Sequence, residues 1–156
     1  MDLRARCREL DLAAFPERRA IPGRHRDVDA RDHLNNIAVA ELFSEARAHF
    51  VRDCFAVSSR PDGMAFVVGQ QAVFYAAEAR FPGEIIIGSG LFAIGGSSLR
   101  FGQALFNDGR CTAIAEAVLV CAQNGRSAPF PPGFVEHAGR FLMAQGTLPR
   151  QLAPLR

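Results

Sequence analysis

The stretch from Met64 to Gln123 most constrains the fold, because it shows no helical repeat of apolar residues. Its apolar residues instead follow the alternation typical of strands, and turn residues divide it into segments. We expect four strands here, at residues 64–75, 84–94, 98–106 and 110–122. Asn107-Asp108-Gly109 joins the last two, since these residues tolerate the positive φ angles of a tight hairpin turn. Consecutive strands of this kind indicate one long antiparallel sheet.

A single amphipathic helix is predicted ahead of the strands. Apolar residues recur there at spacings of three and four, at Ile37, Ala40, Phe43, Ala46 and Phe50. The charged residues that fall off this stripe are Glu41, Glu45, Arg47 and Arg52. Asn35 or Asn36 is a suitable N-cap, because its side-chain oxygen can accept from the free N–H groups of the first turn. We expect the helix to end near Asp53.

One helix with a long antiparallel sheet is an α+β architecture. A length of 156 residues is that of one domain. We divide the chain into an N-terminal extension (1–17), a main domain (18–143) and a loose C-terminal tail (144–156). The main domain begins with an edge strand within residues 18–27 and ends with a short helix at 134–143.

The two faces of the last strand predict what covers the sheet. One face is mostly small, with Cys111, Ala113, Ala115, Ala117, Leu119 and Cys121, and can lie close to the helix. The other face holds Thr112, Ile114, Glu116, Val118 and Val120, which is rather apolar for a face in water. Burial against another subunit is one explanation for this face, so we expect a homo-oligomer.

Composition and charge exclude several classes of function. A net charge of +2 with dispersed basic residues argues against nucleic-acid binding. The cysteines Cys7, Cys54, Cys111 and Cys121 form no CxxC pair, which predicts buried thiols and no metal site. No segment resembles a signal peptide or is apolar for long enough to cross a membrane, so we expect a cytoplasmic protein.

The segment from Arg24 to Phe50 places a carboxylate, an imidazole and a helix start within a few residues. Its motif RDVDARDHLNNIAVAELFSEAR resembles that of hotdog-fold acyl-CoA thioesterases of the 4-hydroxybenzoyl-CoA thioesterase type. In that family an Asp-x-Asp-x-x-Gly-His-x-Asn-Asn loop leads into a central helix with a Phe-x-Glu-Ala-Arg end. The matching residues here are Asp27, Asp29, His33, Asn35, Asn36, Phe43, Glu45, Ala46 and Arg47.

Later segments are also similar to the family. They are Phe81-Pro82-Gly83-Glu84, Ile94-Gly95-Gly96-Ser97-Ser98, and Gly125-Arg126 followed by Pro129 and Pro131. The resemblance covers about residues 20–142 and departs from the family at two positions. Asp32 stands in place of the Gly before His, and Val39 in place of a Tyr of the first helical turns.

The resemblance implies a hotdog fold, in which a long antiparallel sheet wraps around one central helix. It implies hydrolysis of an acyl-CoA thioester without metal or bound cofactor, coenzyme A being part of the substrate, in a homodimer or homotetramer. Asp29 matches the catalytic carboxylate, acting as general base on water or by direct attack. The Asn36 backbone N–H is expected to face the thioester carbonyl, as helix N-termini face anions. His33 either orients water or thioester, or is a local hydrogen-bond partner of Asp32.

Coenzyme A needs positive charge in a groove at a subunit boundary. Arg100 and Arg126 are candidates to bind it, although single arginines at strand margins are usually solvated. Ser98, in the matched turn, is a further candidate. Gln70 or Gln71 lies in the strand by which the family pairs subunits, and either faces Asp29 of the partner subunit or flanks the strand ladder. The alternative function is a catalytically silent hotdog module that binds acyl-CoA or an acyl-carrier-protein thioester.

Overall fold

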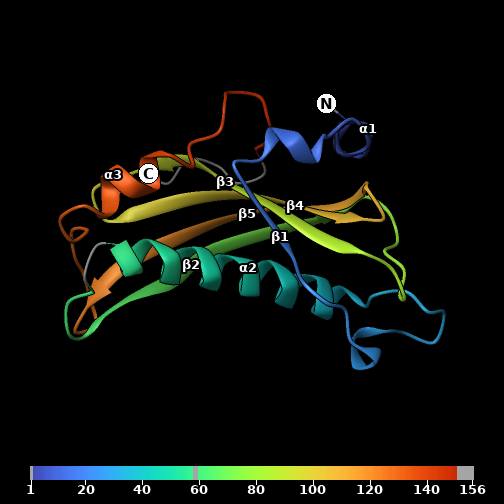
Figure 1. Ribbon diagram of the computed structural model, residues 1–156, viewed down its shortest axis with the longest axis horizontal. Coiled ribbons are helices and arrows are strands. Elements are labelled where there is room, and N and C mark those ends of the chain that lie inside the picture. The colour runs from blue at the N-terminus through green and yellow to red at the C-terminus, as the bar shows by residue number, and fades with distance from the viewer. Residues whose placement is uncertain (1, 58–59, 151–156) are drawn as a thin grey trace.

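The structure, a computed structural model, describes residues 2–57 and 60–150 and shows one long helix lying along a curled sheet (Figure 1). The helical elements are α1 (Leu3–Arg8), η1 (Leu12–Ala14), η2 (His25–Asp27), α2 (Asn36–Val57) and α3 (Phe134–Gly139). The strands are β1 (Glu17–Ala20), β2 (Met64–Tyr75), β3 (Ile85–Ile94), β4 (Ser98–Asn107), β5 (Arg110–Gln123) and β6 (Arg126–Ser127). None of the helices among the described residues is long and apolar enough to cross a membrane.

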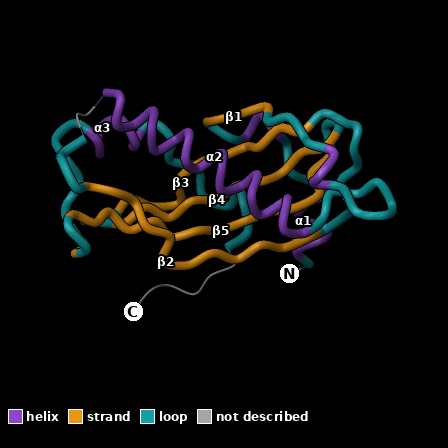
Figure 2. The backbone as a smooth tube through the Cα atoms, turned by 90° about the horizontal axis from the view of Figure 1, so that it is seen from below, coloured by secondary structure: helices purple, strands orange, loops and turns teal. Residues whose placement is uncertain are grey.

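The sheet is antiparallel, in the order β1-β3-β4-β5-β2, with β6 paired to β5. Each of the four expected strands starts and ends within one residue of its predicted position. In Figure 2 the strands run side by side, and α2 extends along them. This arrangement confirms the predicted α+β class and the hotdog fold.

Three predicted elements differ in length from those observed. The edge strand expected within residues 18–27 is the short β1, because Pro22 has no N–H to continue the ladder. Helix α2 continues past Asp53 to Val57, since no glycine or proline interrupts the sequence there. Helix α3 ends at Gly139, before the predicted end.

The core between α2 and the sheet corrects the predicted helix stripe. Phe43, Ala46 and Phe50 are buried as expected, but Ile37 is 68% exposed. Ala46 is nine positions after Ile37, and at about 100° per residue this separation places the two side chains on opposite sides of the helix. Arg47, predicted to lie off the stripe, is 3% exposed. The apolar residues of α2 that complete its buried face are Ala38, Val39, Leu42 and Cys54.

The sheet face away from α2 is covered by the chain's own ends, which corrects the expectation that another subunit buries it. Ile114 and Val118 on this face are already 0% and 1% exposed within one chain. A cluster there joins residues from the N-terminal extension, the strands and the C-terminal segment: Cys7, Phe15, Ala76, Ala104, Phe106, Cys111, Ile114 and Leu148. Figure 1 shows α1 and the C-terminal segment on that side. The division into extension, domain and tail stays a prediction, although residues of the extension and Leu148 contribute to the interior.

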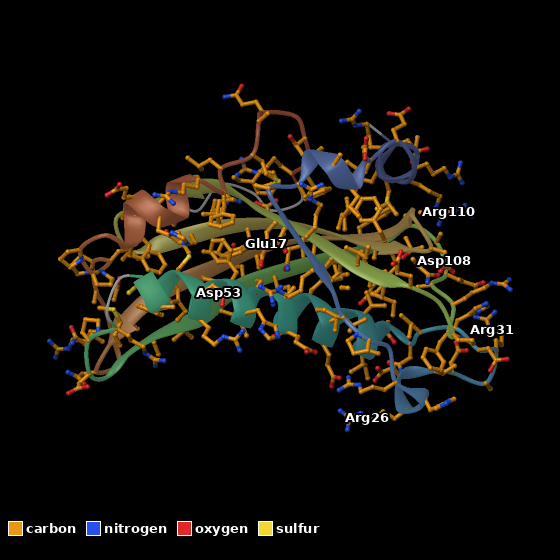
Figure 3. All side chains as sticks on the ribbon, in the orientation of Figure 1. Glu17, Arg26, Arg31, Asp53, Asp108 and Arg110 are labelled. Carbon is orange, nitrogen blue, oxygen red and sulfur yellow. The ribbon has the colours of Figure 1, made fainter. Side chains whose placement is uncertain are left out.

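An arginine joins the first strand to the central helix. One guanidinium nitrogen of Arg19 lies 2.9 Å from the carboxylate of Glu17 on β1 and 2.9 Å from that of Asp53 on α2. Figure 3 labels both acidic residues, which lie on facing elements. The contact fixes the edge of the sheet against the second half of α2.

Candidate functional site

Asp29 lies in a tight turn between η2 and α2. Its Oδ1 accepts hydrogen bonds from the backbone N–H of Arg31 at 2.8 Å and of His33 at 3.1 Å. Its own N–H donates to the carbonyl of His33 at 2.8 Å, which closes the turn. The N–H of Arg31, and secondly that of His33, lowers the pKa of the Asp29 carboxyl below its usual value. The carboxylate is therefore ionised at neutral pH and held in one orientation.

Asp32 adopts the backbone conformation that a glycine would adopt most easily. Its φ is 58°, in the left-handed region that Asp visits more readily than most residues. Its carbonyl accepts from the N–H of Phe81 at 3.2 Å, so this loop is tied to the turn before β3. The side chain of Asp32 is exposed and lines a hollow with His25, Asp29 and Pro82. Asp32 does not line the cavity described below.

Asn35, the first of the two N-cap candidates, caps the central helix. Its Oδ1 accepts from the N–H of Ala38 at 2.9 Å, and its Nδ2 donates to the carbonyl of Asp27 at 2.9 Å. Asn36 is therefore the first residue of α2. The N–H groups of a first helical turn have no intrahelical acceptor, and the positive end of the helix dipole lies there.

A cavity of about 370 Å³ brings the three predicted catalytic residues together. Asp29, His33 and Asn36 line it from the loop and the helix start. The other lining residues come from the same loop, from α2, from the end of β2 and the turn after it, and from β5: Arg31, Leu34, Asn35, Val39, Tyr75, Ala77, Glu78, Ala79, Thr112 and Ala113. A carboxylate and a helix N-terminus thus face one small space.

Tyr75 is a site residue that the sequence did not reveal. Its hydroxyl donates to the Asn36 carbonyl at 3.0 Å, and burial raises its pKa, which keeps it protonated as a donor. Val39, where the family carries a tyrosine, lines the same cavity. Tyr75 is the single tyrosine of the chain, and it lies in β2 rather than at the helix position where the family carries one. This displacement was the signal in the sequence that could have pointed to Tyr75.

Glu78 was also missed, because it lies far from the motif in sequence. Its carboxylate is 3.3 Å from Nε2 of His33 and 3.2 Å from the guanidinium of Arg31. The other ring nitrogen of His33, Nδ1, is buried without a hydrogen-bond partner among the described residues. Glu78 thus orients the imidazole, and Nδ1 is left to bond a water or a ligand.

The residues predicted to bind coenzyme A lie elsewhere in the chain. Ser98 pairs with Val120, and Arg126 with Gln123, near the end of β5. Ala113 of the cavity lies near its start, and seven residues at about 3.3 Å each separate it from Val120 by roughly 23 Å. One chain therefore does not bring these residues to the cavity of Asp29.

Arg100 and Gln71 are engaged within the protein. Arg100 lies 2.6 Å from the buried carboxylate of Glu116, which argues for a structural role. Gln71 accepts a hydrogen bond from Arg47, whose guanidinium also donates to Gln103 at 2.8 Å. Binding of coenzyme A by Arg100, Arg126, Ser98 or Gln71 stays a prediction.

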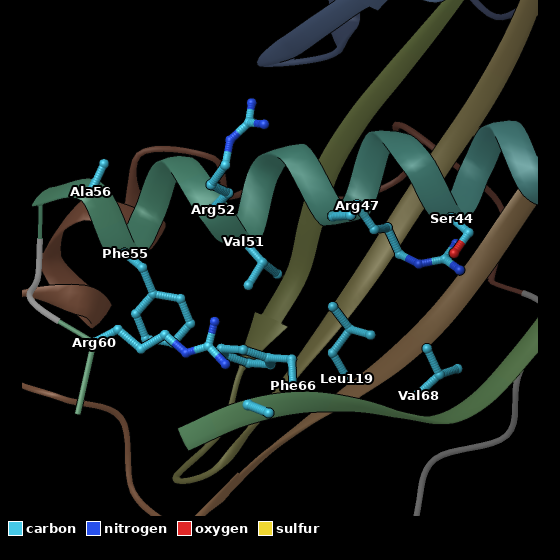
Figure 4. A pocket seen from close by; sticks show the side chains of 12 residues that line it. Ser44, Arg47, Val51, Arg52, Phe55, Ala56, Arg60, Phe66, Val68 and Leu119 are labelled. Carbon is cyan, nitrogen blue, oxygen red and sulfur yellow. The ribbon is translucent and has the colours of Figure 1, made fainter. Parts of the chain in front are cut away.

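A second and larger cavity, of about 640 Å³, lies between the second half of α2 and β2 (Figure 4). Its walls are mainly apolar, with Val51, Phe55, Phe66 and Leu119. Arg47 borders it, and burial lowers the pKa of its guanidinium to about 10. Within residues 2–57 and 60–150, no group of three or more His, Cys, Asp or Glu side chains is arranged to hold a metal ion.

Comparisons with known proteins show the same fold. Among solved structures, a thioesterase from Thermus thermophilus complexed with coenzyme A and Zn is 27% identical, with a TM-score of 0.67 over 82% of this chain and 93% of that one. A Pseudomonas aeruginosa protein is 20% identical, with a TM-score of 0.78 over 86% and 97% of the two chains. A Staphylococcus aureus protein in complex with CoA is 13% identical, with a TM-score of 0.72 over 88% and 94%. The last two likenesses show the fold alone.

No curated protein matches the sequence significantly. The sequence profile of the Thioesterase-like superfamily matches residues 24–138, which include the loop, the central helix and all the long strands. The chain therefore belongs to the thioesterase-like superfamily.

Proposed function

We propose that the protein hydrolyses an acyl-CoA thioester to the free acid and coenzyme A. The observation that carries this proposal is the shared cavity of the Asp29 carboxylate and the start of α2 at Asn36. Thioester hydrolysis needs a nucleophile activated near the carbonyl carbon, and donors aimed at the oxygen that becomes negative. Asp29 serves the first need and the Asn36 N–H, with the helix dipole, the second.

The reaction proceeds by one of two routes. As general base, Asp29 takes a proton from a water that attacks the carbonyl carbon. As nucleophile, Asp29 attacks that carbon itself and forms a mixed anhydride, which water then hydrolyses. In both routes the thiolate of coenzyme A leaves and takes up a proton. In this proposal His33, held by Glu78, orients the water or the thioester, and Tyr75 steadies the first turn of α2.

The proposed site is completed by a second copy of the chain. β2 is an edge strand, and Val67, Val68, Gln70 and Gln71 in its middle are exposed. A long exposed edge invites pairing with another strand. Antiparallel pairing of two β2 strands about this middle would bring the Tyr75 end of one copy beside the Met64 end of the other. Met64 pairs with Gln123, which pairs with Arg126, so Arg126 of the partner subunit would approach the Asp29 cavity.

The test is thiol release from acyl-CoAs of short, medium, long and aromatic acyl groups. We expect turnover of at least one, and a loss of about 10²-fold or more in Asp29→Asn, as for removal of a general base. Asp32→Asn is the matched control, because Asp32 lies in the same loop outside the cavity and Asn tolerates its positive φ. It is expected to keep turnover within a few-fold.

The pH dependence follows from the lowered pKa of Asp29. The ionised carboxylate is the reactive form. Activity therefore falls only when the pH drops below about 3.9, the ordinary pKa of an aspartate side chain. Full turnover by a folded Asp29→Asn variant would show that Asp29 is not the catalytic carboxylate. Binding of acyl-CoA without thiol release by the wild type would favour the silent module.

A further inference from the structure

Two cysteines from distant parts of the sequence meet behind the sheet. Cys7 on α1 and Cys111 at the start of β5 are 104 positions apart, yet their Sγ atoms lie 2.7 Å from each other. Both side chains are buried, with 0% and 3% exposure. A disulfide bond is about 2.05 Å long, so less than 1 Å of movement separates this pair from bonding distance.

The surroundings of the pair hold it in place. α1 packs against β5, and both thiols lie in the cluster that Phe15, Phe106 and Ile114 complete. Helix α1 lies on the side of the sheet away from α2 (Figure 1). Two thiols fixed this close in an apolar setting need no rearrangement of the fold to become linked.

We propose that Cys7 and Cys111 form a reversible disulfide that fastens the N-terminal extension to the sheet. Hydrogen peroxide is the oxidant. The Cys7 thiolate attacks a peroxide oxygen, giving a sulfenic acid and, after protonation, one water. The Cys111 sulfur then displaces the sulfenic oxygen as a second water, and the Cys111 proton is lost. The two thiols give up two electrons and two protons, and the peroxide is reduced to two waters.

The two thiols differ in a way that suits these roles. The hydrogen bond from Cys111 lowers the pKa of Cys7 and raises that of Cys111, whose burial raises it further. Burial raises the pKa of Cys54 to about 12 and also raises that of Cys121. While α1 is packed, Cys7 is therefore the cysteine with the most thiolate character of the four. A brief loosening of this short terminal helix admits the peroxide to the pair.

The proposed disulfide joins a residue outside the matched superfamily region to one inside it. Cys7 precedes residues 24–138, which match the superfamily. Cys111 is followed directly by Thr112 and Ala113, which line the Asp29 cavity from the other face of the strand. The bond would thus close a loop that contains Asp29, His33 and Asn36, and its Cys111 end would lie directly beside the cavity lining.

The experiment treats the reduced, full-length protein with hydrogen peroxide, then alkylates it under denaturing conditions and measures intact mass. Untreated protein is expected to take up four alkyl groups, one for each cysteine. Oxidised protein is expected to take up two, to be 2 Da lighter before alkylation, and to yield a peptide linking Cys7 to Cys111. The bond is expected to raise Tm by on the order of 10 °C, and dithiothreitol to reverse both changes.

Single serine variants at the four cysteines supply the controls. Cys54→Ser and Cys121→Ser are expected to keep the linked peptide, whereas Cys7→Ser and Cys111→Ser are expected to lose it. The wild-type mapping does not depend on the folding of any variant. Four alkylated cysteines after peroxide treatment, a link between another pair, or oxidation to sulfinic acid without a link overturns the proposal.

Discussion

The Arg100–Glu116 ion pair is a buried contact whose loss should cost much of the protein's stability. The Glu116 side chain is 0% exposed and that of Arg100 13%, with 2.6 Å between their charged atoms. Arg150, which is 47% exposed, lies 3.3 Å from the same Glu116 oxygen. Removing one partner of a buried pair typically costs about 3 to 5 kcal/mol, because the other charge is left in the interior.

Two single substitutions give costs that differ in size. In Glu116→Met, the remaining Arg100 keeps some contact with water and Arg150 can be hydrated, so we expect the lower value of about 3 kcal/mol. In Arg100→Met, the fully buried Glu116 keeps the more exposed Arg150, and we expect about 4 kcal/mol. For a domain of this size these losses lower Tm by roughly 6 to 16 °C.

The double variant Arg100→Met/Glu116→Met tests the electrostatic explanation. Replacing both charges by apolar groups of similar size is often neutral, so we expect it to be more stable than either single variant. The measurement is urea unfolding of all four proteins. Arg110→Met is the control, because Arg110 is an exposed arginine at the start of β5 (Figure 3), and its loss should change stability by less than about 0.5 kcal/mol.

Additive losses in the double variant would refute this reasoning, since they would show that the two side chains stabilise the protein independently. Turnover of Arg100→Met, measured below its Tm, separates the structural role from binding of coenzyme A. If the role is structural, KM for the acyl-CoA is unchanged. A rise in KM with little loss of stability would instead favour the role predicted from the sequence.

Two further predictions concern the outer surfaces of the sheet. A Cβ on Gly88 would lie 2.6 Å from the ring of Phe15, so Gly88→Ala should lower the free energy of unfolding by about 1 to 3 kcal/mol in a denaturant titration. Gly96→Ala is the control and should cost little, because a Cβ there would have no atom within 4 Å. Equal effects of the two substitutions would contradict the packing of Phe15 on Gly88. Pairing through β2 predicts a dimer or larger by light scattering at micromolar concentration, and Val68→Asp, which places a charge on the exposed edge, should shift it toward monomer. A wild-type monomer would exclude the proposed two-chain site.

Features set by neighbouring residues were predictable from the sequence. The hairpin at Asn107-Asp108-Gly109 forms with φ of 50° at Asp108 and 76° at Gly109, as those residue types allow. The N-cap is Asn35, one of two candidates, and the positive φ of Asp32 agrees with its replacement of a glycine. Such features depend on local backbone preferences, which a sequence carries directly.

Features that depend on distant residues were not predictable in the same way. Spacing alone could not tell that Ile37 faces solvent, because the direction of the buried stripe depends on where the sheet lies against the helix. Burial of Arg47 depends on Gln71 and Gln103, which come from two strands. The contacts of Tyr75 with Asn36 and of Glu78 with His33 likewise join segments about 40 residues apart or more.

The positions of the predicted coenzyme A residues bear on how the site is assembled. Ser98 and Arg126 lie near one end of β5, whereas the Asp29 cavity lies near the other. If they bind the same substrate, the proposed antiparallel pairing of two β2 strands would let the acyl-CoA extend from the cavity of one chain to the strand ends of another. Arg100 lies on the neighbouring strand β4 and pairs with Glu116, so the Arg100→Met variant decides between a structural role and binding of coenzyme A.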